Sequence, residues 1–165
     1  MLFDIRGAEN SIRREDLELL LCQTPACSAT HKAKRQKVVE LYENSVRSYE
    51  PMISYPGEHD LYQKFTSSFA QYLEASKRAG DLLSASKTGD ALDVLSSDAI
   101  VGDFDTALAA ASDDLSLNAK NGTEEARSAT SASTRATWIN AVVTLFIVLL
   151  AAIIGIVLRS RVTIS

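Results

Sequence analysis

Residues 139–158, INAVVTLFIVLLAAIIGIVL, form an apolar run of twenty residues without a charged side chain. As a helix rising 1.5 Å per residue, the run is about 30 Å long, which matches the hydrocarbon core of a lipid bilayer. Trp138 precedes the run, and Arg159 and Arg161 follow it. Aromatic and basic residues at these places are typical of membrane boundaries. The run predicts a transmembrane helix, because buried helices of soluble proteins are rarely so long and so uniformly apolar.

The charges on the two sides of this run predict its orientation. Two of the seven residues after it are arginines, whereas all 21 Asp and Glu residues precede it. The positive-inside rule therefore favours residues 159–165 as a cytoplasmic stub and residues 1–138 as an extracytoplasmic domain, in the periplasm if the membrane is a bacterial inner membrane. The N-terminal sequence MLFDIRGAEN has no apolar segment that would direct export. We therefore expect either an earlier membrane helix outside this sequence or a tail-anchored protein that faces the cytosol.

The composition before the apolar run is that of an all-α protein. The chain has only 3 prolines and 7 glycines, and no segment alternates between apolar and polar residues as a strand does. A net charge of −4 without a broad basic surface argues against a nucleic-acid partner. The two histidines, His31 and His59, and the two cysteines do not have the spacing of a zinc site. Since catalytic and nucleotide-binding motifs are also absent from the sequence, we expect no enzyme, no metal and no cofactor.

Apolar residues recur at helical spacing in four segments before the apolar run. In the first, Ile5, Ile12 and Leu19 are seven residues apart, which is typical of a helix packed nearly parallel to its neighbours. The predicted helices span about 1–22, 28–50, 58–95 and 98–138. They predict an antiparallel up-down-up-down four-helix bundle that continues into the transmembrane helix at 139–158. The turns near 24–26 and 96–99 are expected at the end distal to the membrane.

Cys22 and Cys27 flank the predicted turn at Pro25. In an extracytoplasmic domain they could form a disulfide worth about 2 kcal/mol, provided that the helix is broken between them. The alternative is a pair of small buried residues or free thiols. The choice depends on the compartment, since disulfides persist where the environment is oxidising.

Four segments of this chain also resemble a known family. They are SIRREDLELLL, EHDLYQKFTSSFAQYLEAS, KTGDALDVL and FDTALAAASDDLSLNAKN. Together they resemble the periplasmic four-helix-bundle sensor domain of bacterial methyl-accepting chemotaxis proteins. The resemblance implies a homodimeric chemoreceptor that binds a small ligand near its distal end and transmits the signal through a slight shift of the fourth helix. It also implies a truncated receptor, whose first membrane helix and kinase-coupling cytoplasmic region lie outside this sequence.

The resemblance further implies a ligand site formed by the first helix and the turn before the fourth. The implied contact residues are Arg13, Arg14, Ser96, Ser97 and Thr106. An arginine guanidinium binds a carboxylate through two parallel hydrogen bonds, so a small organic acid or amino acid is the expected ligand. Adjacent arginines point about 100° apart on a helix, so at most one of them lines the site, and Glu15 or Asp16 could simply pair with them.

Partners and alternatives also follow from the resemblance. The full receptor would act on a coupling protein and a histidine kinase, and some members of the family sense through a periplasmic binding protein instead of directly. Two other functions are compatible with the sequence. The same bundle could belong to a histidine kinase or a cyclase, or it could be a tail-anchored cytosolic interaction module with reduced cysteines.

Overall fold

The computed structural model describes the backbone of residues 1–162 and the side chains of residues 1–148, 150 and 153. The chain divides into two compact units, Met1–Ala119 and Lys120–Ser165. Its elements are α1 (Leu2–Leu21), α2 (Pro25–Tyr49), the short 3-10 helix η1 (Glu50–Met52), α3 (Glu58–Ser84), α4 (Thr88–Ser96) and α5 (Asp98–Val162). The predicted all-α class is confirmed, since the described residues contain no strand.

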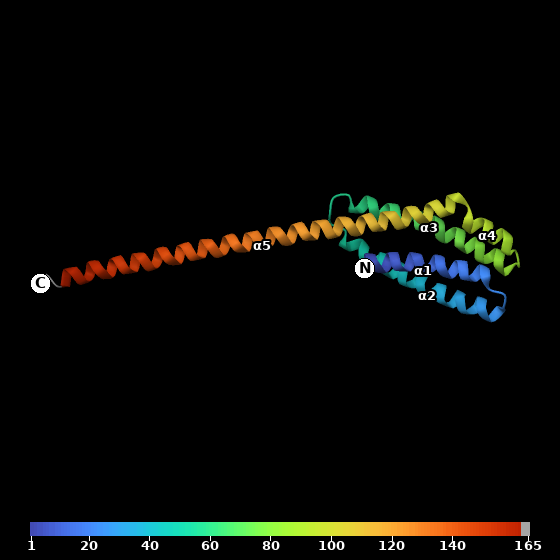
Figure 1. The fold of residues 1–165 in the computed structure, drawn as a ribbon, viewed down its shortest axis with the longest axis horizontal. Coiled ribbons are helices and arrows are strands. Elements are labelled where there is room, and N and C mark those ends of the chain that lie inside the picture. The colour runs from blue at the N-terminus through green and yellow to red at the C-terminus, as the bar shows by residue number, and fades with distance from the viewer. Residues whose placement is uncertain (163–165) are drawn as a thin grey trace. The chain divides into compact units, whose positions relative to one another are not determined.

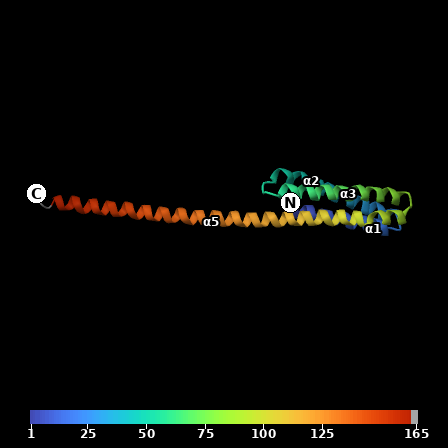
Figure 2. The ribbon, with the colours of Figure 1, turned by 90° about the horizontal axis from the view of Figure 1, so that it is seen from above.

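The first unit is a bundle of antiparallel helices (Figures 1 and 2). Helices α1 and α2 form one hairpin, helices α3 and α4 form a second, and α1 contacts both α3 and α4. The connections at 22–24 and 85–87 lie at one end of the bundle, which we call the tip (Figures 1 and 2). The N-terminus and the connection at 50–57 lie at the opposite end, which we call the base (Figures 1 and 2).

The segment 58–95, which we expected to be one helix, is two helices. Two residues after the end of α3, Ser86 adopts the left-handed conformation at φ 61°, where glycine is the usual residue. The Lys87 N–H donates to the Leu82 carbonyl at 2.9 Å, and the Ser86 N–H donates to the Leu83 carbonyl at 3.0 Å. These two bonds close α3 as a Schellman motif. Helix α4 therefore already runs back towards the base, and the 96–99 turn lies about 14 Å, nine helical residues, below the tip.

Helix α2 begins three residues earlier than predicted. Pro25 is its first residue, a position where the missing N–H costs nothing. The Thr24 hydroxyl accepts a hydrogen bond from the Cys27 N–H at 3.2 Å and caps the helix. The proline thus starts α2 rather than occupying the turn.

The apolar stripes read from the sequence form the core of the bundle. Ile5, Ile12, Phe65 and Phe69 are fully buried at 0 % exposure. The aromatic rings pack against one another along this core; the Tyr42 and Phe69 rings are tilted, with centroids 4.6 Å apart. On α5, by contrast, the buried face is made largely of small side chains, namely Ala107, Ala110 and Ala111 below Phe104.

In the second unit, α5 continues without a break through Asn121-Gly122-Thr123. Seven large apolar side chains between Ile139 and Val148 are each more than half exposed. Among the described residues, no helix qualifies by length and apolarity as a membrane span. The expected span 139–158 includes side chains that lie outside the described part of the chain, namely those of 149, 151, 152 and 154–158. The side chains of the expected stub, 159–165, also lie outside it.

Candidate functional site

A cavity of about 270 Å³ lies at the tip of the bundle, between α1, α2, α3 and α4. Charged side chains of both signs line it, namely Asp16, Lys32, Arg35, Lys77 and Asp81. The five residues expected at a ligand site are absent from the described lining of this cavity.

Arg35 and Asp16 form the centre of the polar network beside this cavity. Arg35 Nε donates to Asp16 Oδ1 at 2.5 Å, and a second guanidinium nitrogen donates to the Ser76 hydroxyl at 2.7 Å. The Tyr72 hydroxyl donates to the other Asp16 oxygen at 2.9 Å. Burial and the Asp16 charge raise the pKa of Tyr72, so its hydroxyl remains a donor at neutral pH. The network joins α1, α2 and α3, and it satisfies a carboxylate that is only 4 % exposed.

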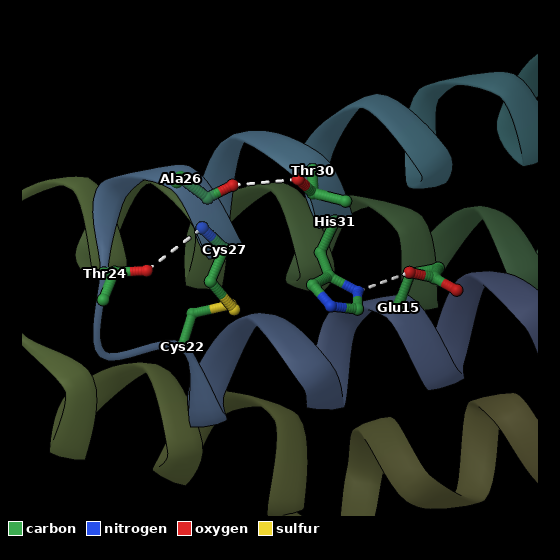
Figure 3. Close-up of a disulfide and its surroundings, with 7 residues drawn as sticks. All are labelled: Glu15, Cys22, Thr24, Ala26, Cys27, Thr30 and His31. Carbon is green, nitrogen blue, oxygen red and sulfur yellow. Dashed lines mark hydrogen bonds and ion pairs between the residues drawn. A yellow bond between two sulfur atoms is a disulfide. The ribbon is translucent and has the colours of Figure 1, made fainter.

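A second polar cluster lies beside the disulfide that the structure forms between Cys22 and Cys27, whose Cα atoms are 5.5 Å apart. Figure 3 shows the His31 ring between this disulfide and Glu15. His31 Nδ1 and Glu15 Oε2 are 2.7 Å apart. Burial acts to raise the pKa of Glu15, but the hydrogen bond from His31 and the charges around the carboxyl group, including those of Lys34 and Arg14, outweigh it, so the pKa is lowered. Glu15 is therefore ionised at neutral pH.

The two candidate arginines of α1 point in different directions, as helix geometry requires. The Arg13 guanidinium lies over the Phe104 ring at 4.6 Å and over the Tyr72 ring at 5.7 Å from the centroid. Within the described part of the chain, Arg13 has no carboxylate at ion-pair distance. Arg14 instead has a side chain that is 66 % exposed and lies 3.4 Å from Glu15. The expected pairing with Glu15 thus applies to Arg14 and not to Arg13.

The candidates near the fourth helix differ in their exposure and in their hydrogen bonds. Ser96 is exposed, and the Ser97 hydroxyl donates to the Val94 carbonyl at 3.0 Å. Thr106 is half-buried on α5. Because the chain reverses at 85–87, Ser96 and Ser97 lie at the junction of α4 and α5 rather than at the tip.

Two buried carboxyl groups meet at the base of the bundle. The Tyr49 hydroxyl lies 2.5 Å from Glu58 Oε1 and 2.9 Å from Asp114 Oδ2. The Asn118 amide donates to both acids, at 2.8 Å to Glu58 and 3.1 Å to Asp114. The other Glu58 oxygen accepts the Ser54 and Tyr55 N–H groups. We call this set the base network; it ties α5 to the connection between α2 and α3.

The pKa values of the two acids in the base network are shifted in opposite directions. Burial acts to raise the pKa of Glu58, but four hydrogen bonds, the first from Tyr49, lower it overall. Burial, together with the charge of Glu58, raises the pKa of Asp114 to about 6. Because a hydroxyl has only one hydrogen, Tyr49 can donate to only one of the two acids. Below about pH 6, Asp114 is protonated and can remove this conflict by donating to the Tyr49 oxygen.

Glu9 is the least satisfied polar group of the bundle. Its side chain is 0 % exposed, and neither carboxyl oxygen has a hydrogen-bond partner among the described residues. Burial raises its pKa to about 8, although Arg6 acts to lower it. Glu9 is therefore neutral at pH 7.

Replacing Glu9 with leucine is expected to raise the free energy of unfolding at pH 7 by about 1–3 kcal/mol, the cost of an unsatisfied buried polar group. The gain should grow from about pH 4.5 to about pH 8 and level off above it, because over this range the folded wild type holds a proton on Glu9 that the unfolded chain has released. Thermal unfolding of the full chain at pH 6.5 and pH 9 measures both effects. Glu18→Leu, at an exposed site on the same helix, is the matched control. A Glu9→Leu variant that is no more stable than this control at either pH would contradict the assignment.

The comparison with protein families decides the identity of this bundle. Residues 1–132 match the family described as a four helix bundle sensory module for signal transduction, which occurs in chemotaxis receptors. The chain belongs to this family. The sensory module is a signalling domain rather than a catalytic one, and the resemblance stated from the sequence is confirmed. No curated protein and no solved structure matches the chain.

Several polar residues of the sensory module were not predicted from the sequence, although the pattern of apolar residues contained a signal for them. Extending the stripe of Val38 and Tyr42 backwards by helical steps of three and four residues reaches Arg35 and then His31. A dense basic run such as 31–37 is usually a solvated face of a helix. Two of its members instead pair with acids of α1.

Proposed function

We propose that this chain is the sensor region of a chemoreceptor and that Arg13 binds the carboxylate of a small organic acid or amino acid. The observation that carries the proposal is the guanidinium of Arg13, which lies over Phe104 without an acidic partner among the described residues. An aromatic face stabilises the cation while leaving its N–H groups available. A ligand carboxylate would supply the missing acceptors.

The tip cavity is the weaker candidate for this ligand. Its arginine, Arg35, already donates to Asp16 and Ser76, and Lys32 donates to the Ser84 hydroxyl at 3.2 Å. A ligand there would have to replace these bonds, whereas a ligand at Arg13 would not. The cavity residues therefore serve stability in this proposal.

The receptor is proposed to act as a homodimer through the exposed face of α1. Phe3 and Leu17 lie two heptads apart on this helix and are 70 % and 42 % exposed, and Leu21 is 74 % exposed. Large apolar side chains at heptad spacing are the seam by which parallel helices pack. This spacing therefore fits packing against α1 of a second copy of the chain.

The second unit is proposed to cross the inner membrane, with the bundle in the periplasm. The exposed apolar side chains from Ile139 to Val148 would then contact lipid instead of water. The Cys22–Cys27 disulfide fits the periplasm, where such bonds persist. Ligand binding at Arg13 would act on α5 through Phe104. A differential affinity worth a few kcal/mol would suffice to bias two states of the dimer and, through them, the coupling protein and histidine kinase.

A thermal-shift screen of the full chain in detergent against organic acids and amino acids tests this proposal. A ligand at one hundred times its dissociation constant should stabilise the protein by about 2.7 kcal/mol. We expect Arg13→Ala to abolish the shift and Arg14→Ala, the exposed neighbour, to keep it. A shift that survives in Arg13→Ala would move the ligand elsewhere. A folded dimer that responds to none of the compounds would favour sensing through a binding protein.

A further inference from the structure

We propose that reduction of the Cys22–Cys27 disulfide converts the tip of α1 and α2 into a binding site for a thiophilic divalent cation such as Zn²⁺, with two thiolates and the His31 imidazole as ligands. This inference goes beyond the sensor function proposed above and uses a different set of residues. The spacing of the cysteines and histidines in the sequence predicted no metal site, because spacing alone does not show which side chains the fold brings together.

The first support is the distance between the three side chains. One ligand atom from each of Cys22, Cys27 and His31 lies within 4.8 Å of the others. Cys27 and His31 are four residues apart on α2, which places both on one face of that helix. Cys22 comes from the end of α1 and meets this face across the short turn (Figure 3).

The second support is the orientation of His31. His31 Nδ1 lies 2.7 Å from a carboxylate oxygen of Glu15, which acts as an acceptor, so the neutral ring carries its proton on that nitrogen. Nε2 then has the free lone pair that a metal ion needs. A carboxylate that holds the second ring nitrogen in this way is the usual support of a metal-binding histidine. Figure 3 shows the ring between Glu15 and the two sulfur atoms.

The geometry fits a tetrahedral cation once the sulfur–sulfur bond is broken. With Zn–S bonds of about 2.3 Å, the two sulfurs of a tetrahedral site are about 3.8 Å apart. An external dithiol or phosphine supplies two electrons, and with two protons the disulfide becomes two thiols. Binding of the cation then releases these two protons and leaves two thiolates on the metal. A water molecule would be the fourth ligand, as in zinc sites with three protein ligands.

Reduction therefore exchanges one cross-link for another. In the oxidised chain the sulfurs bond to each other and cannot serve as thiolate ligands. In the reduced chain the cation would hold α1 and α2 together at the same place. The site would report the presence of both a reductant and a thiophilic cation at the tip of the bundle.

Cobalt titration of the full chain in detergent tests this inference, because Co²⁺ gives a thiolate charge-transfer band and visible bands that report tetrahedral geometry. The protein is reduced with a phosphine, freed of the reductant under nitrogen and titrated with Co²⁺. We expect one Co²⁺ per chain, displacement by Zn²⁺, and no thiolate band from the oxidised chain. Cys22→Ser and Cys27→Ser should each lose most of the charge-transfer intensity.

Histidine variants separate the proposed site from two bare thiols. His31→Ala and His31→Asn, the latter retaining a donor for Glu15, should weaken cobalt binding at least tenfold. His59→Ala, at the exposed histidine of α3, should bind like the wild type. Glu15→Gln should weaken binding about tenfold, as expected for a residue that positions a ligand. Circular dichroism of each reduced, metal-free variant controls for folding. The proposal is overturned if the reduced wild type gives no thiolate band, or if both His31 variants, with helical content retained, bind as tightly as the wild type.

Discussion

Replacing Arg35 with alanine is expected to lower the free energy of unfolding by about 3–5 kcal/mol, because it leaves the Asp16 carboxylate buried without its cationic partner. Among the described residues, only the Tyr72 hydroxyl would remain to hydrogen-bond this group, and Ser76 would lose its guanidinium donor. Denaturant unfolding of the full chain, followed by circular dichroism, measures the loss.

Two further variants show whether the loss comes from the buried charge. Lys34→Ala removes the exposed cation next in sequence and should change stability by less than about 0.5 kcal/mol. Adding Asp16→Asn to Arg35→Ala should recover part of the loss, since the buried group is then neutral. If Arg35→Ala proves as stable as Lys34→Ala, the network at the tip does not contribute to stability.

Replacing Glu58 with alanine is expected to cost about 2–4 kcal/mol, because the variant removes the shared acceptor of the base network. The Tyr49 hydroxyl and the Asn118 amide would each lose one acceptor, and the Ser54 and Tyr55 N–H groups would lose theirs. Asp114 would retain bonds to Tyr49 and Asn118. Denaturant unfolding at pH 7 measures the cost.

The pH dependence of this cost identifies its origin. Folding lowers the pKa of Glu58, so its contribution is fully present above the unfolded value of 4.5 and is lost as the pH falls through the folded value. The difference between wild type and Glu58→Ala should therefore narrow in acid. His59→Ala, at the exposed next residue, should be neutral at every pH. A cost that stays constant from pH 7 to pH 3 would show that packing, rather than the ionised carboxylate, explains it.

Apart from the break between α3 and α4, the sequence was sufficient for the helices and for the apolar core, because a spacing of three and four residues fixes which side of a helix is buried. It was not sufficient for the polar residues on that side. Glu9 and Asp16 alternate with Ile5, Ile12 and Leu19 in steps of four and three, so the first helix places acids within its buried stripe. Whether such an acid has a partner depends on the other helices. Asp16 meets Arg35, whereas Glu9 meets no donor among the described residues.

The reversal after α3 could not be located from local propensity. Gly80 and Gly89 lie near the break, but Ser86 adopts the left-handed conformation that usually requires glycine. The two Schellman hydrogen bonds offset this cost. The helical pattern of the apolar residues also continues across the break, so it predicted one helix. Because the break was not predicted, Ser96 and Ser97 were expected at the tip.

The directions of the two candidate arginines followed in part from the sequence. Helix geometry required Arg13 and Arg14 to diverge, and the structure places Arg13 against Phe104 and Arg14 towards solvent. Which of the two would face the bundle depended on the rotation of α1 relative to α5. The aromatic partner on α5 could not be read from α1 alone.

The alanines of α5 have a mechanical consequence. Ala107, Ala110 and Ala111 present low ridges to the bundle, so a small translation of this helix requires few changes of rotamer in its neighbours. Interlocked leucines would resist the same displacement. The base network does resist it, since each of its bonds has a fixed length and direction. The first unit therefore combines a face of small side chains at Ala107–Ala111 with directional hydrogen bonds at Asp114 and Asn118, and any translation of α5 would have to break these bonds first.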